Sequence, residues 1–394
     1  MVHSGAVPLS GLRVLDLSRL LPGPFCSLLL ADLGADVIKV EDPNGGDYVR
    51  WSPPLHGEYS ALYYTLNRNK RSIKIDLKSE AGREAFLRLA AGADVVLESF
   101  RPGVMDRLGV GYEALRAVNP AVILCSISGY GQDGPYRDRA GHDLNYMAIG
   151  GALGINGTVD GDVAMPGVQV GDLGGGAMSA TIAILAALHH RERTGEGQHC
   201  DVSMLDGIVS WLSMHAGRFF HNGEVPGPGT LHLNGRHPCY SVYRCKDGWM
   251  SVGALEPKFW TALVESLDVP HLESEAFSEG EQARRVHDEL EQIFLTRTKA
   301  QWAEHFAGRD VCCEPVLTFP EVFANEQVRH RGLEIEAGKG GPLPQTGFPF
   351  QLSATPPKVR RTAPGYGENT REVLAEAGYS DAEIDALIAA GATG

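Results

Sequence analysis

The sequence predicts an α/β protein with an open, Rossmann-like parallel sheet in a large domain and a smaller α+β domain. In the first 130 residues, short runs rich in valine, isoleucine and leucine alternate with helical segments, and near residue 240 the pattern changes to a hairpin followed by helices. Alternating strands and helices are typical of βαβ units, whose strands are parallel. Because 394 residues are too many for one ordinary core, two domains are expected.

The first βαβ unit is predicted from a strand over 12–17, a helix over 25–33 and a strand over 35–41. Proline precedes this helix, where the first turn needs no N–H donor. The alternation then predicts, in order, a strand over 72–77, a helix over 79–91, a strand over 94–99, a helix over 112–118 and a strand over 121–128. No Gly-x-Gly-x-x-Gly follows the first strand, so a nicotinamide or flavin enzyme is disfavoured.

The second half begins with two long apolar helices, predicted over 175–193 and 204–220. A segment rich in glycine and proline, 223–232, follows as a linker. Lys246-Asp247-Gly248 then lies between two strand-like runs and predicts a hairpin. Helices are expected over 257–267, 281–296 and 299–307, then a strand over 312–319 and a last helix after the capping box that begins at Ser380.

Composition limits the classes of partner. The formal charge is 35 − 49 = −14, which disfavours nucleic acid as a general partner but allows a local basic pocket. The apolar runs are shorter than a bilayer requires, and the N-terminus lacks the order of a secretory signal. A cytoplasmic protein without a membrane partner is therefore expected. The seven cysteines form no Cys-x-x-Cys, and no histidine spacing indicates zinc, so neither disulfides nor a metal site are predicted.

Two residues in glycine-rich sequence, His142 and Asp172, are candidates for an acid/base pair. A neutral histidine and an ionised aspartate could remove a proton from one face of a carbon and add one to the other. Each also has a structural explanation: His142 as a loop histidine and Asp172 as the N-cap of the following helix. Backbone N–H groups at that helix start could stabilise an anion. Eleven of the 36 residues from 141 to 176 are glycine, which suggests a backbone packed against a ligand.

Glu256 precedes Pro257 at a predicted helix start. A carboxylate is common there for its effect on the helix dipole, and it could also hold an imidazole in position. Basic and polar residues near strands are candidates for phosphate binding, since ligands of open α/β folds lie beyond the carboxyl ends of strands. These candidates are Lys39, Asn67, Lys70, Arg71 and Arg101. Each could equally be a surface charge.

The chain resembles the class III CoA-transferase superfamily over nearly its whole length. The matching segments are residues 9–17, 31–41, Phe100-Arg101-Pro102-Gly103, 129–135 and the stretch 194–207, which ends at Asp206-Gly207. The resemblance implies binding of an acyl-CoA thioester, with Tyr130 and Gly131 added to the CoA contacts. It implies a large domain over 1–205 and 330–394, a linker helix and loop over 206–224, and a small domain over 225–329. It also implies a homodimer of interlocked subunits whose active sites are shared between them.

The resemblance also separates two reactions. The transferase branch uses an aspartate as a nucleophile, which matches Asp172. The α-methylacyl-CoA racemase branch adds a histidine in Gly-His-Asp and a glutamate in Gly-Ala-x-Glu-Pro, which match His142 and Glu256. We therefore expect a racemase of 2-methylacyl-CoA thioesters that transfers a proton through an enolate, with Glu256 of the partner subunit orienting His142 and with no cofactor. The alternatives are a CoA-transferase with a covalent Asp172 intermediate, and a CoA-ester binding protein.

Overall fold

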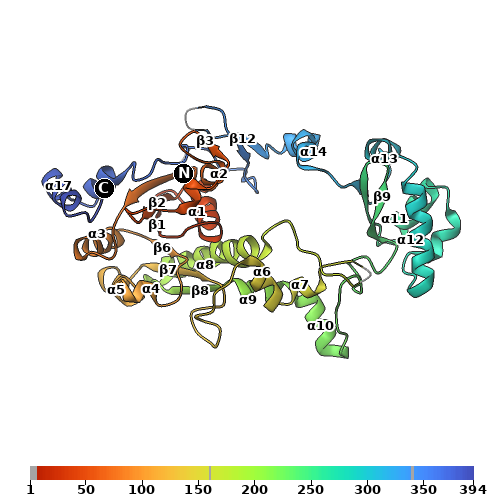
Figure 1. Cartoon of the computed structure of the whole chain (residues 1–394), viewed down its shortest axis with the longest axis horizontal. Coiled ribbons are helices and arrows are strands. Elements are labelled where there is room, and N and C mark those ends of the chain that lie inside the picture. The colour runs from red at the N-terminus through yellow and green to blue at the C-terminus, as the bar shows by residue number, and fades with distance from the viewer. Residues whose placement is uncertain (1–6, 159–160, 339–340) are drawn as a thin grey trace. The chain divides into compact units, whose positions relative to one another are not determined.

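The computed structural model describes residues 7–158, 161–338 and 341–394 (Figure 1). The chain forms two compact units, each described here by itself. Unit 1 contains the residues up to Gly150, Val168–Trp211 and Glu326–Gly394. Unit 2 contains Gly151–Gly167 and Leu212–Asn325. The chain passes from unit 1 to unit 2 after Gly150 and again after Trp211, and it returns to unit 1 after Gly167 and after Asn325.

Unit 1 is built on a sheet of six parallel strands in the order β5-β2-β1-β6-β7-β8. The strands are β1 (Arg13–Asp16), β2 (Asp36–Glu41), β5 (Lys70–Lys74), β6 (Val95–Glu98), β7 (Ile123–Ser128) and β8 (His199–Ser203). This is the strand order of the Rossmann fold, so the predicted open parallel α/β sheet is confirmed. Only β8 was not predicted, because its sequence, His-Cys-Asp-Val-Ser, has no run of β-branched residues.

Helices cover both faces of this sheet (Figure 1). On one face, apolar side chains of the central strands pack with α3 (Glu80–Ala90), α5 (Tyr112–Val118), α16 (Thr370–Glu376) and α17 (Asp381–Ala389). On the other lie α1 (Pro22–Asp32) and α8 (Ser179–Thr194). Smaller elements of unit 1 are η1 (Tyr48–Trp51), β3 (Leu55–His56), β4 (Tyr59–Ser60), α2 (Ala61–Asn67), α4 (Val104–Arg107), α6 (Asp143–Ile149), α9 (Met204–Trp211), α15 (Glu326–His330), β12 (Glu334–Glu336) and β13 (Pro344–Thr346).

The glycine-rich segment forms a π-helix, η2 (Gly171–Met178), that continues directly into α8. Its glycines let α9 approach closely: a Cβ at Gly174 would lie 2.0 Å from the Trp211 ring, and one at Gly175 would lie 2.7 Å from the Met204 carbonyl oxygen. Gly174 and Gly175 therefore pack against a helix, whereas Gly141 of the same glycine-rich stretch lines the cavity described below. Among the described residues, only the combined helix Gly171–Thr194 is long and apolar enough for a membrane span, and 56% of its apolar 18-residue window is buried, as in a core helix.

Unit 2 contains an antiparallel sheet in the order β11-β10-β9. Its hairpin joins β9 (Tyr240–Cys245) to β10 (Gly248–Gly253), at the Lys-Asp-Gly turn where the sequence predicts it. Trp260 and Trp302 are buried against this sheet. The remaining elements are α7 (Ala152–Ile155), α10 (Ser213–Asn222), α11 (Pro257–Ser266), η3 (Pro270–Glu275), α12 (Gly280–Phe294), α13 (Lys299–Phe306), β11 (Cys313–Pro315) and α14 (Phe319–Ala324).

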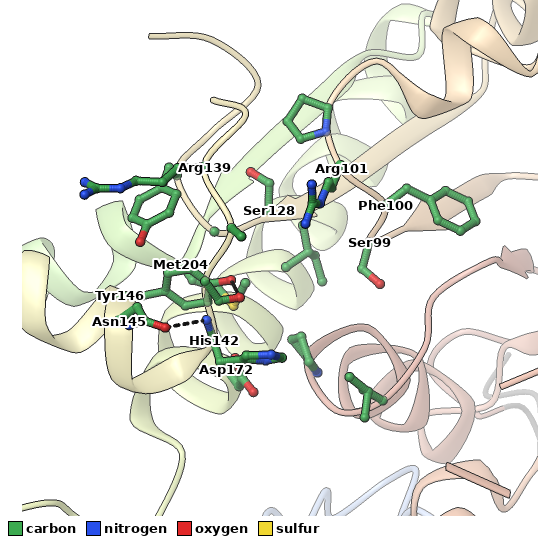
Figure 2. Close-up of a pocket in the computed structure, with 18 of the residues that line it drawn as sticks. Ser99, Phe100, Arg101, Ser128, Arg139, His142, Asn145, Tyr146, Asp172 and Met204 are labelled. Atoms are coloured by element: carbon green, nitrogen blue, oxygen red, sulfur yellow. Dashed lines mark hydrogen bonds between the residues drawn. The ribbon is translucent and has the colours of Figure 1, made fainter. Parts of the chain in front are cut away.

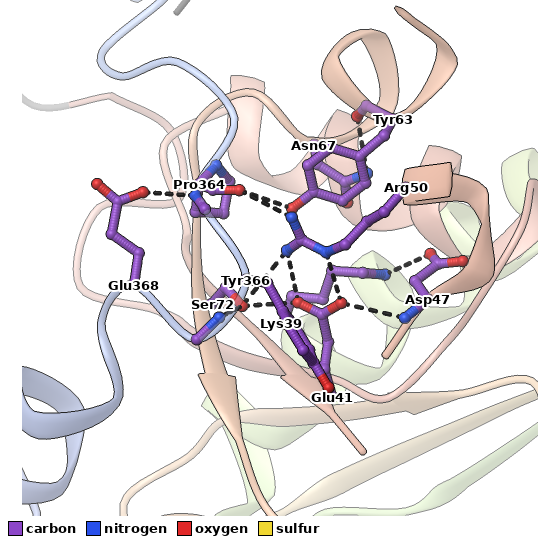
Figure 3. A network of polar contacts seen from close by, with 12 residues as sticks. Lys39, Glu41, Asp47, Arg50, Tyr63, Asn67, Ser72, Pro364, Tyr366 and Glu368 are labelled. Carbon is purple, nitrogen blue, oxygen red and sulfur yellow. Dashed lines mark hydrogen bonds and ion pairs between the residues drawn. The ribbon is translucent and has the colours of Figure 1, made fainter. Parts of the chain in front are cut away.

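A buried ion pair links the carboxyl end of β2 to η1, and its arginine also binds the C-terminal segment (Figure 3). Arg50 Nε and Nη2 donate to the two carboxylate oxygens of Glu41 at 2.9 and 2.6 Å. The guanidinium also lies 3.8 Å from the centre of the Tyr63 ring and donates to the Pro364 carbonyl. Burial acts to raise the pKa of Glu41, but the hydrogen bond and charge of Arg50, together with Lys39 and Ser72, outweigh it and leave that pKa lowered. The buried Glu41 carboxylate therefore remains ionised because Arg50 is paired with it.

Arg50→Met should lower the stability of the protein by about 3–5 kcal/mol, because it leaves the Glu41 charge buried without its partner. Arg285→Met is the matched control, since the Arg285–Glu281 pair is 69% and 76% exposed and its loss should cost less than about 0.5 kcal/mol. Urea-induced unfolding of the two variants and the wild type measures the difference. Equal unfolding midpoints for the two variants would contradict the structural role of the buried pair.

Candidate active site

A cavity of about 530 Å³ opens where the strand order reverses, between the carboxyl ends of β1 and β6. In open α/β sheets, the chain leaves two such strands toward opposite sides and the loops leave a crevice between them. Leu20, in the loop after β1, lines the cavity and has a φ of 64°, a left-handed conformation that is costly for leucine. The crevice lies in unit 1, and the loops after β1, β6, β7 and β8 all contribute to it.

His142 and Asp172 both line this cavity (Figure 2). His142 is the N-cap residue of α6, and its backbone N–H donates to Asn145 Oδ1 at 3.0 Å. Asp172 lies in the first turn of η2 and is only partly exposed. π-helical turns are rare in proteins, and those that occur are often found at functional sites. The structure thus brings together the two residues that the sequence proposed as an acid/base pair.

The electrostatic environment gives Asp172 a pKa of about 6, well above the usual value for aspartate. Burial is the largest cause, and the negative charge of Asp143 raises the pKa further, while His142 opposes the rise. At about pH 6, only slightly below neutral, the Asp172 carboxyl is therefore protonated in half of the molecules. A group with such a pKa can both accept and donate a proton under physiological conditions.

Asp143 connects the two candidate residues. Its Oδ1 accepts the backbone N–H of Asp172 at 2.9 Å, and it follows His142 directly in the chain. The N–H of Leu173 is likewise bonded, to the Gln169 carbonyl. The prediction that the amides beside Asp172 stabilise an anion is therefore not supported, because both already have acceptors within the protein.

Tyr146 fixes the loop that precedes His142. Its ring fills the space beside Gly129 and Gly141, where added Cβ atoms would lie 2.4 and 2.6 Å from it. Its hydroxyl donates to the Gly141 carbonyl, and its ring meets that of Tyr130 edge to face at 5.2 Å. Burial, followed by the charge of Asp172, raises the Tyr146 pKa to about 12, so the hydroxyl remains a donor.

Four arginines give the cavity a positive wall, although the whole chain has a charge of −14. They are Arg19, Arg101, Arg137 and Arg139. Of these, only Arg101 was identified from the sequence. Arg19 follows β1, so the strand-end rule that indicated Arg101 could have indicated it too. Guanidinium groups bind phosphate oxygens through paired hydrogen bonds. This wall can therefore hold a ligand that contains phosphate.

The other predicted phosphate contacts lie away from the cavity. Lys39 is buried against Asp47, with 2.9 Å between the charged atoms. Lys70 is buried too, and its Nζ donates to Ser27 Oγ at 2.7 Å and to Asn67 Oδ1 at 3.0 Å. We therefore no longer assign Lys39, Asn67 and Lys70 to the substrate, because they satisfy polar groups of the fold.

Arg71 is also occupied by partners within the fold. Its guanidinium pairs with Asp36 at 2.6 Å, Glu376 at 2.7 Å and Glu372 at 3.0 Å. It is therefore removed from the candidate substrate contacts as well.

The remaining candidates differ in their positions. Arg101 and Tyr130 line the cavity. Gly131 follows Tyr130, and its N–H donates to Ser128 Oγ at 2.9 Å, so that Gly131 shapes the loop without lining the cavity. Glu256 is the N-cap residue of α11 in unit 2, where its side chain is exposed.

Comparisons with known proteins identify the family to which the chain belongs. The family model for CoA-transferase family III matches residues 9–370. A succinate–glutarate CoA-transferase of Agrobacterium fabrum is 38% identical over 94% of this chain and 95% of its own length. An α-methylacyl-CoA racemase of Mus musculus is 37% identical over 95% of each chain. The solved structure of a CAIB/BAIF family protein from Brucella suis matches with a TM-score of 0.84 and 34% identity, covering 94% of this chain and 99% of that one.

Asp143→Asn should lower the pKa of Asp172 from about 6. The substitution removes a negative charge, while the Asn side-chain oxygen can still accept the Asp172 N–H. A ¹³C NMR titration of the aspartate carboxyl groups measures this pKa, with Asp172→Asn identifying the signal. The exposed Asp133→Asn is the control and should leave the titration unchanged. An unchanged or raised pKa in Asp143→Asn would show that Asp143 does not control Asp172.

Proposed function

Because the chain belongs to CoA-transferase family III, whose members act on acyl-CoA thioesters, we propose that it is a racemase of 2-methylacyl-CoA thioesters. The observation that supports this proposal is that His142 and Asp172 line one cavity, with the Asp172 pKa raised to about 6. A carboxylate that acts only as a nucleophile does not need a proton. One that gives and takes protons needs a pKa close to the working pH.

In the proposed reaction, the arginine wall binds the phosphates of CoA and the α-carbon lies between His142 and Asp172. One of the two residues removes the α-proton, and the electron pair moves onto the thioester oxygen to form an enolate. The other, protonated at the start, gives its proton to the opposite face of the carbon. The charge then returns from the oxygen, and the configuration is inverted. The thioester makes the α-proton acidic, so the step requires no metal or redox cofactor.

The enolate oxygen needs donors, and the first turn of α6 supplies the best candidates. The first N–H groups of a helix have no partner within the helix. The N–H groups of Asp143 and Leu144 occupy this position directly after His142. Asn145 holds the His142 backbone and thus the entry to this turn. We assign the enolate oxygen to these amides.

Glu256 and the quaternary structure belong to the same proposal. In an interlocked homodimer, Glu256 of the partner subunit would accept a hydrogen bond from His142 and orient the imidazole. The exposed position of Glu256 at the start of α11 leaves its carboxylate available for this role. We propose such a dimer, acting in the cytoplasm, as the working form of the enzyme.

A CoA-transferase reaction is the second candidate, and the names of several similar relatives favour it. Asp172 would then attack the thioester carbonyl, CoA thiolate would leave, and a mixed anhydride of Asp172 would remain. This reaction uses Asp172 as a nucleophile and requires nothing of His142.

His142→Ala should reduce interconversion of the two 2-methylacyl-CoA enantiomers by at least about 100-fold, because one face of the carbon loses its acid/base group. In D₂O, the variant should still exchange the α-proton of the enantiomer whose proton faces Asp172, and it should do so with retention of configuration. Chiral separation of the products, followed by mass spectrometry, measures both quantities.

The exposed His190→Ala serves as the control and should racemise as the wild type does. Unchanged interconversion in His142→Ala would refute the proposed role of His142. Hydroxylamine would distinguish the second candidate, since it converts an Asp172 anhydride to a hydroxamate only if the transferase intermediate forms.

A further inference from the structure

A second, smaller cavity of about 100 Å³ lies in unit 1 beside the end of β6. It shares Arg101 with the large cavity and is otherwise formed by residues that the proposed reaction does not use. The polar residues that line it, besides Arg101, are Glu98, Asp106, Tyr112, Ser126, Gln132 and His199. The cavity therefore places a cluster of titratable groups next to the residues that bind substrate.

Glu98 is the central group of this cluster. It is the last residue of β6 and is only 3% exposed. Its Oε2 accepts the backbone N–H of Phe100 at 2.7 Å, and its carboxylate also accepts a hydrogen bond from Ser126. No cation pairs with Glu98 among the ion pairs of the described residues. A buried carboxylate without a cation depends on such donors to remain charged.

Phe100 connects Glu98 to two of the cavity arginines. The Arg19 guanidinium lies 5.7 Å from the centre of the Phe100 ring, and Arg101 is the next residue in the chain. Ser99 also connects the loops after β1 and β6, because its Oγ accepts a hydrogen bond from the Arg19 backbone N–H at 3.4 Å. The hydrogen bond from the Phe100 N–H to Glu98 thus determines the position of the short loop after β6. This loop contains Arg101 and contacts Arg19.

A chain of hydrogen bonds leads from Glu98 toward the surface. Ser126 Oγ lies 2.9 Å from His199 Nε2, and the His199 ring stacks on Tyr112 at 5.7 Å. Since the hydroxyl donates to Glu98, its oxygen can accept from a protonated Nε2. The negative charges of Asp106, on α4, and Asp201, on β8, both oppose the ionisation of Glu98.

We propose that Glu98 is a positioning residue for the CoA-binding cavity: its ionised carboxylate holds the Phe100 loop, and its protonation releases that loop and weakens binding. The inference rests on the family's use of acyl-CoA thioesters and does not depend on the racemase reaction. Burial, together with Asp106 and Asp201, outweighs the hydrogen bonds from Ser126 and Phe100 and raises the Glu98 pKa to about 7. The carboxyl is therefore mostly protonated below neutral pH and mostly ionised above it.

Glu98→Gln tests the proposal, because glutamine keeps a hydrogen-bond acceptor and removes the charge. Binding of CoA itself is measured by isothermal titration calorimetry over a range of pH. The ratio of the wild-type to the Glu98→Gln association constant cancels the ionisation of CoA and of other residues. This ratio should rise from about 1 at low pH to about 5 at high pH, since a hydrogen bond to a charged acceptor is stronger than one to a neutral acceptor. The midpoint should lie near pH 7, the pKa of Glu98.

Two further variants make the test specific. Ser126→Ala removes a donor that stabilises the carboxylate, so it should move the midpoint to higher pH, which a purely structural role would not do. If Glu98→Gln does not fold, the ratio of the wild-type to the Ser126→Ala association constant tests the proposal instead: it should exceed 1 just above pH 7, where only the wild-type carboxyl is mostly ionised, and return to about 1 at higher pH. Glu113→Gln changes an exposed glutamate of α5 and should match the wild type at every pH. Equal affinities of the wild type and folded Glu98→Gln at all pH values would overturn the inference, as would an unmoved midpoint in Ser126→Ala.

Discussion

The reversal of strand order between β1 and β6 is the constraint on which the rest of the structure depends. Because connections on the two sides of this point run over opposite faces, neither covers the carboxyl ends of the two central strands. The loops that follow these strands supply Arg19 and Arg101 to the cavity. The α6 and η2 segments add His142 and Asp172 to the same opening, so that the phosphate-binding and proton-transfer groups share one space.

Charged residues in unit 1 fall into two groups that burial and partners distinguish. Arg50, Lys70 and Arg71 are buried with fixed acceptors, and they stabilise the edge of the sheet and its contact with the C-terminal segment. The cavity arginines line an opening instead, although Arg137 among them also pairs with the exposed Asp138. Asp172 differs from both groups, since burial and Asp143 raise its pKa without a buried cation to lower it. In this unit, a buried charge with fixed partners indicates structure, and a charge that lines the cavity indicates chemistry.

Much of this arrangement was predictable from sequence. The βαβ alternation predicted five of the six parallel strands, and the glycine-rich motifs predicted that His142 and Asp172 belong to one site. The basic cluster around Lys70 misled, because sequence does not show that its partners are Asp16 and the carboxylates of distant helices. The role of Gly174 in η2 was hidden for a similar reason, because the Trp211 ring that it accommodates is far away in the chain. Pairings over long sequence separations decide which charges and glycines are free for function, and local patterns do not contain them.

The central claim is that this site moves a proton rather than an acyl group. The most direct measurement incubates the wild-type protein in D₂O with one pure enantiomer of a 2-methylacyl-CoA thioester and with a free carboxylic acid as acceptor. The account predicts that both enantiomers appear, that the product of inverted configuration contains deuterium at the α-carbon, and that CoA remains on its original acyl group. Transfer of CoA to the acceptor acid, with the α-carbon retaining its proton and configuration, would contradict it.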